Sequence, residues 1–425
     1  MTPRDFLRGT RSRRLLQDGR EGGVEGLDAP LEIVPGDVVG VVLMNLGGPS
    51  ERGDVEPFLY NRLMDPAEGD WTVPEFVRHQ AARVLARRRA RRLADAYEQI
   101  GGVSPLARYT AEQAAALERR LSGALAAATG AAFRTYVAMR HWHPSSEEAA
   151  AQMAADGVTK TILLPLHPHY SAATTGSSVA YWQALEAAGE IPVWPTALVR
   201  EFAAHPTFVQ ALAERVDEGL QRFPRDARAG VQVVFCGQGA HHAALREKDP
   251  YCCLVHATVQ QVVDARADHD RREVHVAFQR PLVPGRGLGP TLDATLDALA
   301  DDGPAHVLVV PVSFVSDRVE TAYDLDVVVR ARAATQGITH FEVTNGLNGH
   351  PLLIDTLAAC VAAQVRPAPM GDGLPALLPG TMRLAHAASE RTVRCGECTF
   401  VAEPCDWRAS PAAAPELSEA PRRAA

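Results

Sequence analysis

The sequence predicts an α/β protein of two lobes, in which helices flank parallel β-sheets. Apolar strand-like runs alternate with helical segments along the chain, and this order is typical of βαβ units. The pattern occurs twice, over residues 39–200 and again over residues 201–366. Ligands of such sheets bind beyond the carboxyl ends of the strands, so we expect a cleft between the lobes.

Each predicted strand is a short apolar run. The first begins at Val38 and ends at the turn Gly47–Gly48–Pro49. The others cover residues 135–139, 159–166, 231–236, 273–278 and 305–312. Helical segments lie between them at residues 109–121, 145–157 and 202–216. The polar, Gly-rich residues 1–38 are expected to form a disordered extension, and the Pro/Ala-rich residues 367–425 an irregular tail.

Composition narrows the class of protein. A net charge of -8 argues against nucleic acid as a partner. No run approaches the roughly 18 apolar residues of a membrane span, and the N-terminus lacks the apolar core of a secretory signal, so we expect a cytoplasmic protein. The basic run RVLARRRARR, residues 83–92, predicts either a solvated helix face or a contact for anionic lipid or ligand carboxylates.

The stretch FCGQGAHHAALREKDPY, residues 235–251, follows an apolar strand and carries several reactive groups. Strand ends that turn through glycine and then present polar side chains often form active sites in α/β enzymes. Cys236, Gln238, His241 and His242 are therefore candidates for chemistry at the second lobe.

The stretch VSFVSDRVETAYDLD, residues 312–326, predicts a helix that starts near Ser316–Asp317. Positions i and i+4 share a helix face, so Glu320 and Asp324 form an acidic strip with Asp317 beside it. Such a strip can accept protons or pass a hydrated cation inward. The alternative is structural, because Asp317 and Glu320 also match a capping box.

The first lobe offers matching strand ends. His167 and His169 alternate, so both point to one side of an extended segment. The hydroxyl-rich residues 174–178 precede a helix and suit an anion, with ordinary N-capping as the alternative. Arg140 follows another strand and is predicted either to bind a carboxylate bidentately or to be a surface charge.

These stretches together resemble the ferrochelatase family, and its protoporphyrin-type branch more than its coproporphyrin-type branch. The segments that carry the resemblance are residues 44–66, 97–114, 143–166, 170–178, 248–251, 313–326 and 345–358. The resemblance implies two Rossmann-like lobes that bend a porphyrin between them. It also implies an enzyme that inserts ferrous iron, its substrate, into that ring as the last step of haem synthesis.

The resemblance assigns roles to individual residues. Glu320 and Asp324 match the acidic residues that handle protons or the metal, and Glu320 is the one predicted to bind the metal. The positions that match the porphyrin site are Met44, Ser104–Pro105, Arg140, Tyr170, Thr174, Thr175, Ser177, Ser178 and Phe314.

Three positions depart from the family pattern. Gln238 stands where the family has its catalytic histidine, Arg318 where a second histidine is usual, and Gly287 where a tryptophan is expected. A neutral amide cannot take a proton near pH 7. The candidates for a displaced base are His241 and His242, with His141, His167 and His169 as further ones.

The departures leave other functions open. One alternative is a porphyrin- or haem-binding protein that has lost the catalytic base. Another is a chelatase for a different metal or tetrapyrrole. The partners expected in every case are small molecules, and the chain is predicted to be a monomer or a homodimer.

Three of the seven cysteines, Cys395, Cys398 and Cys405, lie close together in the tail. Their spacing resembles the ligand set of family members that carry a [2Fe-2S] cluster. A zinc site and free thiols remain the alternatives. The region that supplies a fourth ligand in such members has Ala172 and Ala173 here, and the substitutes to consider are Cys236, Cys252, Cys253 and Cys360.

Overall fold

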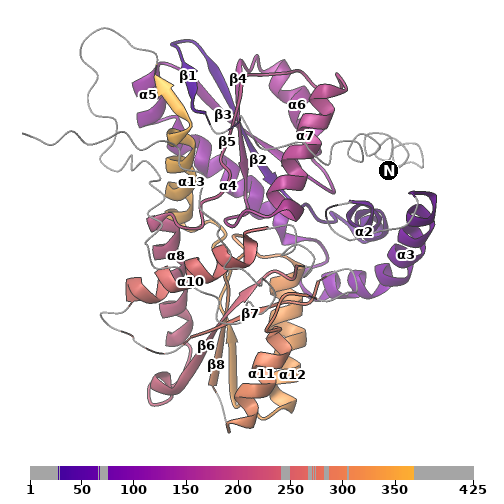
Figure 1. Cartoon of the computed structure of the whole chain (residues 1–425), viewed down its shortest axis with the longest axis vertical. Helices are drawn as coiled ribbons and strands as arrows, with labels where there is room; N and C mark the ends of the chain where they lie inside the picture. Colours follow the sequence, from indigo (N-terminus) through magenta and orange to yellow (C-terminus); the bar gives the residue numbers. More distant parts are fainter. Residues whose placement is uncertain are drawn as a thin grey trace, which may run out of the picture.

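Two four-stranded parallel sheets form the frame of the protein (Figure 1). The computed structural model describes residues 27, 29–65, 67, 75–240, 249–266, 270, 272, 274–281, 287–303 and 306–367. The first lobe contains the sheet β3-β2-β4-β5, with β2 (Val38–Asn45), β3 (Ala132–Met139), β4 (Lys160–Pro165) and β5 (Thr196–Leu198). The second contains β7-β6-β8-β9, with β6 (Val231–Gly237), β7 (Val274–Phe278), β8 (His306–Pro311) and β9 (His340–Val343).

Both faces of each sheet are covered, which explains why the strands are apolar throughout. In β2, Val41 and Leu43 belong to one hydrophobic cluster, whereas Val42 and Met44 belong to another on the opposite face. This alternation follows from the two-residue period of a strand. The predicted α/β class and all six predicted strands are thereby confirmed.

The remaining elements connect and cover the strands. The helices are α2 (Val55–Met64), α3 (Glu75–Gln99), α4 (Pro105–Leu121), α5 (Ala124–Thr129), α6 (Ser146–Ala155), α7 (Ser177–Ala187), α8 (Pro206–Gln221), α10 (Tyr251–Arg266), α11 (Leu292–Asp301), α12 (Arg330–Thr335) and α13 (Pro351–Ala363). Two further segments, η2 (Ala172–Gly176) and η4 (Glu320–Val329), are π-helical. Short 3-10 turns occur at η1 (Arg52–Asp54) and η3 (Arg228–Gly230).

The ends of the described chain meet in the first lobe, which corrects two predicted boundaries. Strand β1 (Leu31–Ile33) pairs in parallel with β10 (Val365–Pro367), so residues 31–38 are structured rather than disordered. Ile33 is 1% exposed and joins the main hydrophobic cluster, which stabilises this pairing. Helix α13 packs against α4, so the end of the predicted second lobe returns to the first.

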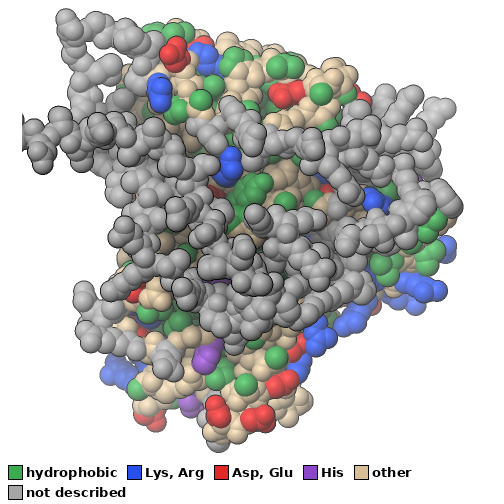
Figure 2. Space-filling model, in the orientation of Figure 1, with side chains coloured by type: hydrophobic (Ala, Val, Ile, Leu, Met, Phe, Trp, Pro, Cys, Tyr) green, Lys and Arg blue, Asp and Glu red, His purple; other side chains and the backbone are tan. Residues whose placement is uncertain are grey.

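A hairpin of α2 and α3 projects beside the two lobes (Figure 1). Its apolar side chains form one cluster with Val319 and Tyr323 around the start of η4. The basic run, residues 83–92, lies on α3. Lys and Arg side chains gather along the edge where this helix lies (Figure 2). Within the described ranges, we find no helix that is both long and apolar enough to cross a membrane.

Candidate active site at the facing sheet edges

The carboxyl ends of the two sheets face each other, and direct contacts join them. Ser171, beyond β4, donates to Asp249 of the second lobe over 2.9 Å. Gln113 of α4 donates to Ser316, beyond β8, also over 2.9 Å. The polar strand ends that the sequence singles out in both halves therefore lie along one interface.

The acidic segment after β8 begins later than predicted. The π-helix η4 begins at Glu320, and its N-cap residue, Val319, makes no side-chain cap bond. Asp317 is engaged elsewhere: its carboxylate accepts hydrogen bonds from Thr321 at 3.0 Å, from the Gly346 backbone at 3.0 Å and from the Asn348 side chain at 2.6 Å. The predicted start near Ser316–Asp317 is therefore wrong, and so is the capping box, because Asp317 anchors the loop after β9.

Glu320 lies between two guanidinium groups. Arg62 Nη1 is 3.2 Å from Glu320 Oε1, and Arg318 Nε is 3.2 Å from Glu320 Oε2. Gln279 also donates to the Glu320 carbonyl oxygen over 2.9 Å. Burial alone raises the pKa of Glu320, but the charges of Arg318 and Arg62 outweigh it and lower that pKa below its ordinary value. Glu320 is thus held as a carboxylate.

Asp324 lies one turn further along η4 and is exposed to solvent. The surrounding protein partly removes water from the Asp324 carboxylate, and Glu320 adds a nearby negative charge. Both effects raise the pKa of Asp324 to about 7. The exposed side chain of Asp324 keeps contact with water. The two carboxylates of the acidic strip therefore differ: Glu320 stays ionised, whereas Asp324 titrates and can exchange its proton with water.

The hydroxyl-rich segment of the first lobe forms the π-helix η2 and the start of α7. Ser171 caps it by accepting from the Ala173 backbone over 3.2 Å, and Asp249 accepts from the Ala172 backbone over 2.8 Å. The buried hydroxyl oxygens of Thr174 and Thr175 have no hydrogen-bond partner among the described residues. Hydroxyls left unpaired in this way are expected to bind a ligand or water.

Arg140 is a buried charge rather than a surface one. Its Nη2 is 2.9 Å from Asp65 Oδ2, and its Nε donates to Ser177 Oγ over 2.9 Å. Ser177 in turn donates to Asp65 over 2.7 Å, and Arg140 stacks on the Tyr181 ring at 4.5 Å. Asp65 thus pairs with the Arg140 guanidinium, which the sequence predicted to bind a ligand carboxylate.

The histidines of the first lobe have different surroundings. The His169 ring packs against Phe208, and its Nε2 lies 3.0 Å from Thr258 Oγ1. Burial lowers the pKa of both His167 and His169 to about 3, with the charge of Arg318 adding to the effect at His167. Both rings are therefore neutral near pH 7. His141 is buried, with Nε2 3.6 Å from Asp65.

Gln238 follows β6, and its backbone carbonyl accepts a hydrogen bond from the Tyr251 hydroxyl over 3.1 Å. Phe314, beyond β8, lies under the Arg318 guanidinium at 4.5 Å. Met44 is 1% exposed and packs inside the first lobe. At Gly287 an added Cβ would lie 2.8 Å from Pro281 Cδ, so the tryptophan expected there cannot be placed on this backbone without a shift of the proline.

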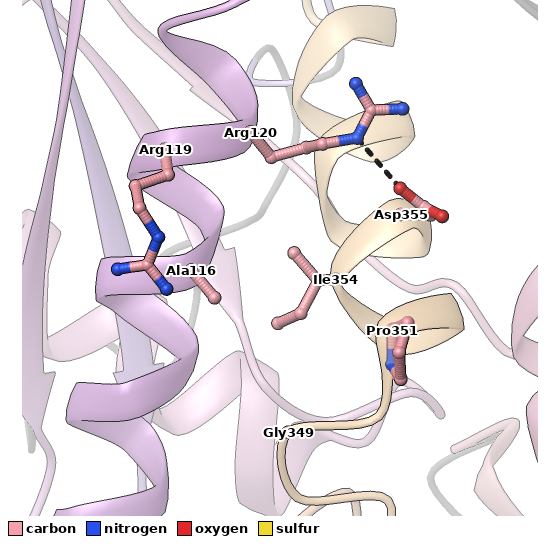
Figure 3. A pocket seen from close by; sticks show the side chains of 7 residues that line it. All are labelled: Ala116, Arg119, Arg120, Gly349, Pro351, Ile354 and Asp355. Atoms are coloured by element: carbon pink, nitrogen blue, oxygen red, sulfur yellow. Dashed lines mark hydrogen bonds and ion pairs between the residues drawn. The ribbon is translucent and has the colours of Figure 1, made fainter.

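Other predicted residues lie outside the described ranges, namely His241, His242, Cys395, Cys398 and Cys405. Among the residues that the structure describes, no group of three or more His, Cys, Asp or Glu side chains is placed to hold a metal ion. A surface hollow between α4 and α13 is lined by Ala116, Arg119, Arg120, Gly349, Pro351, Ile354 and Asp355 (Figure 3). None of the predicted site residues lines it.

Several residues of the site escaped the reasoning from sequence. Arg62 and Asp65 lie at the end of α2, Asp249 precedes α10, and Gln279 follows β7. The sequence does contain a signal for Arg62 and Asp65. The stretch VEPFLYNRLMD places a cation and an anion three residues apart in an apolar helix, where charged side chains are unusual. Their partners are remote in the sequence, so the signal does not say what they bind.

Comparisons with known proteins identify the family of the chain. The family model described as Ferrochelatase matches residues 38–365. A ferrochelatase of Geotalea daltonii is 37% identical over 322 residues, which cover 76% of this chain and 96% of the relative. One of Gloeobacter violaceus is 35% identical over 326 residues, with the same two coverages. The solved structure titled SirB from Bacillus subtilis with Fe3+ is more distant, at a TM-score of 0.42 and 16% identity over 60% of this chain and 89% of that one. The chain belongs to the ferrochelatase family.

Proposed function

We propose that this protein inserts ferrous iron into a porphyrin, protoporphyrin IX or coproporphyrin III, in haem biosynthesis. The observation that carries the proposal is the acidic π-helix η4, which places Glu320 and Asp324 after β8 in a chain of this family. In the reaction two pyrrole N–H bonds break and iron(II) takes the place of the two protons, with no transfer of electrons. The site must therefore hold the ring and carry two protons away.

Asp324 is the group that we assign to proton transfer. A carboxylate whose pKa is raised towards 7 is matched to accepting and releasing protons near neutral pH. Its exposure gives each proton a route to water. Glu320 is assigned to electrostatics, because its two arginine partners occupy both oxygens and disfavour protonation or direct binding of iron.

The histidine positions of the family are not used for proton transfer here. The Gln238 amide cannot accept a proton, and Arg318 stays charged. His167 and His169, with a pKa of about 3, are too weakly basic to replace a histidine near pH 7. His241 and His242 remain predictions as displaced bases.

The ring is held, in this proposal, between the two sheet edges. We assign Tyr170, Phe314, Thr174, Thr175 and Ser178 to contact with the ring. The support is that the hydroxyl oxygens of Thr174 and Thr175 have no hydrogen-bond partner among the described residues. Arg140 and Ser177 bind Asp65, so they support this wall rather than serve as free clamps for propionates. Met44 contributes from the apolar layer behind the wall.

The proposed cofactor is an iron-sulfur cluster in the C-terminal tail. Cys395, Cys398 and Cys405 are the candidate ligands of a [2Fe-2S] cluster. Ala172 and Ala173 carry no thiol, and burial raises the pKa of the Cys236 and Cys360 thiols to about 12, which disfavours these two cysteines as the fourth ligand. Cys252 and Cys253 remain candidates for it. The absorbance spectrum of the anaerobically purified protein tests this: charge-transfer bands support the cluster, and their absence contradicts it.

We further propose that the arginines of α3 make a peripheral contact with anionic lipid. Arg83, Arg87, Arg88, Arg91 and Arg92 are exposed on this helix. Co-sedimentation with phosphatidylglycerol vesicles but not with phosphatidylcholine vesicles is expected, and equal binding to both contradicts the contact.

A second candidate function, porphyrin or haem binding without catalysis, is favoured by the departures at Gln238, Arg318 and Gly287. The experiment supplies ferrous iron and either porphyrin to the parent protein and to Gln238→His and Asp324→Asn variants, and follows the absorbance of the metallated product. Turnover by the parent, lost in Asp324→Asn, supports the enzyme. Tight porphyrin binding without turnover, with activity appearing only in Gln238→His, would show that the chain is a binding protein.

A further inference from the structure

The last turn of α2 is bonded to both lobes. Asp65 receives hydrogen bonds or ion pairs from Arg140 and Ser177 of the first lobe. Three residues earlier, Arg62 pairs with Glu320 of the second lobe. A third contact adds to the first-lobe side, because the Asn61 amide donates to the His141 carbonyl over 3.0 Å.

These charges are buried, so their geometry is strongly constrained. The side chains of Asp65 and Arg140 are 2% and 4% exposed, and those of Arg62 and Glu320 are 7% and 18% exposed. A buried ion pair resists separation, because removing one partner leaves the other charged and poorly solvated. Each end of this turn is therefore a fixed attachment rather than a loose surface contact.

Apolar packing ties the same turn to the acidic π-helix. Leu59 and Leu63 of α2 belong to one hydrophobic cluster with Val319, the residue before Glu320. Arg62 reaches one oxygen of Glu320 and Arg318 the other. The two guanidinium groups therefore restrain the Glu320 carboxylate from both sides.

We propose that the last turn of α2 is a charged bracket, in which Asp65 attaches to the wall formed by Arg140 and Ser177 while Arg62 positions Glu320 on the opposite wall. Arg62 and Asp65 are positioning residues: they act through Glu320 and Arg140. This inference rests on the proposed function, since the distance that the bracket sets is the space available to the ring. A displacement of reacting groups by about 1 Å costs on the order of 100-fold in rate, so this distance matters for turnover.

The test uses the full-length protein and the variants Arg62→Met, Arg62→Lys, Asp65→Asn, Glu320→Gln and Arg62→Met/Glu320→Gln. Arg52→Met is the matched control, because Arg52 pairs with Asp95 and Glu98 across the same hairpin but is 53% exposed. For each variant we measure kcat, KM for iron, porphyrin affinity by fluorescence and the out-of-plane porphyrin bands in the resonance Raman spectrum.

Arg62→Met and Asp65→Asn are expected to lower kcat on the order of 100-fold, to shift the out-of-plane bands and to change porphyrin affinity far less. Arg62→Lys keeps the charge and is expected to recover part of the rate. On the Glu320→Gln background, Arg62→Met should add little further loss, which is the non-additivity of residues that act through one another. Arg52→Met should behave as the parent.

The bracket would be overturned if the fold-loss of kcat in the double variant equals the product of the losses in Arg62→Met and Glu320→Gln. It would also be overturned if the Raman bands are unchanged in both Arg62→Met and Asp65→Asn. If the parent binds a porphyrin but does not insert iron, the proposed function is wrong. The Raman bands of the bound porphyrin then still test whether Arg62 and Asp65 set its geometry. If it binds none, a double-mutant cycle on unfolding decides: additive Arg62→Met and Glu320→Gln effects contradict the bracket. If Arg62→Met does not fold, Arg62→Lys provides the same cycle.

Discussion

The two π-helical segments occupy matching places in the two lobes but carry opposite chemistry. η2 follows β4 and η4 follows β8, and each of these strands is third in the order of its sheet. η2 is uncharged, and its threonine hydroxyls have no partner within the described part of the chain, whereas η4 carries carboxylates close to arginines. π-helical turns are rare and often mark functional sites. The comparison indicates that one backbone device serves two tasks here: ring contact in the first lobe and charge handling in the second.

Removing the titrating carboxylate of η4 is the largest expected effect. Asp324→Asn should lower kcat by about 10²–10⁴-fold, the contribution typical of a general base. Asp326→Asn is the matched control on the same helix, because Asp326 is exposed and pairs only with Arg330 among the described residues. Iron insertion under saturating porphyrin measures both. An equal loss in the two variants would indicate a general disturbance of η4 instead.

The pH dependence sharpens the same assignment. A base must be deprotonated to work, so kcat should rise with pH through a midpoint near 7, the raised pKa of Asp324. Asp324→Asn should remove this limb, whereas Asp326→Asn should keep it. A limb that persists in Asp324→Asn assigns the titration to another group.

Mild acid should destabilise the protein through the two buried histidines that follow β4. His167 and His169 have folded-state pKa values of about 3, below the ordinary 6.5, so they are neutral when folded and protonated when unfolded over that interval. Their contribution to stability is complete above pH 6.5 and is lost as pH falls towards 3. Thermal midpoints of the parent and of His167→Gln between pH 8 and pH 5 measure this. A midpoint as acid-sensitive in the variant as in the parent would contradict the role of His167.

Asp249→Asn should loosen η2 without touching η4. Its carboxylate accepts from Ser171, from the Ala172 backbone and from the Tyr251 backbone at 3.0 Å. Weakening these buried bonds should cost about 1–3 kcal/mol of unfolding free energy and reduce porphyrin affinity. Denaturant unfolding and fluorescence titration measure the two effects. Unchanged affinity in a destabilised variant would limit Asp249 to a structural role.

The smallest expected effect is a matched pair of threonine substitutions. Thr321 of η4 binds Asp317 through its hydroxyl, so Thr321→Val should cost about 1–2 kcal/mol of unfolding free energy. Thr175 of η2 is fully buried, and its hydroxyl has no partner among the residues that the structure describes. Thr175→Val should therefore leave stability equal or higher and reduce porphyrin affinity. Denaturant unfolding compares the two. Equal losses of stability would mean that the Thr175 hydroxyl is paired after all.

Local sequence patterns were sufficient to predict most strands of the two sheets. Apolar runs gave the strands, because a parallel sheet covered on both faces needs apolar side chains throughout. They were insufficient at the segment after β8, where the spacing of Asp317 and Glu320 suggested a capping box. The remote partners Gly346 and Asn348 bind Asp317 instead, and no local pattern reports them.

The first-lobe hydroxyls show the same limit. Their sequence suggested an anion site or caps, and Ser171 does cap η2. Asp65 neutralises Arg140 because the path of α2 brings these two residues together from distant parts of the chain. Its availability to a ligand was therefore not readable from the chain.

The sequence by itself determined the parallel α/β frame, the family and the places where polar groups follow strands, because these depend on local pattern and on motifs in order. Only the tertiary structure decided which charges meet. It placed Glu320 between Arg62 and Arg318, left Asp324 in contact with water, and joined the lobes through the end of α2. The physical reason is that the ionisation of a carboxylate depends on charges and solvent within a few ångströms, and in this fold those neighbours come from distant parts of the chain.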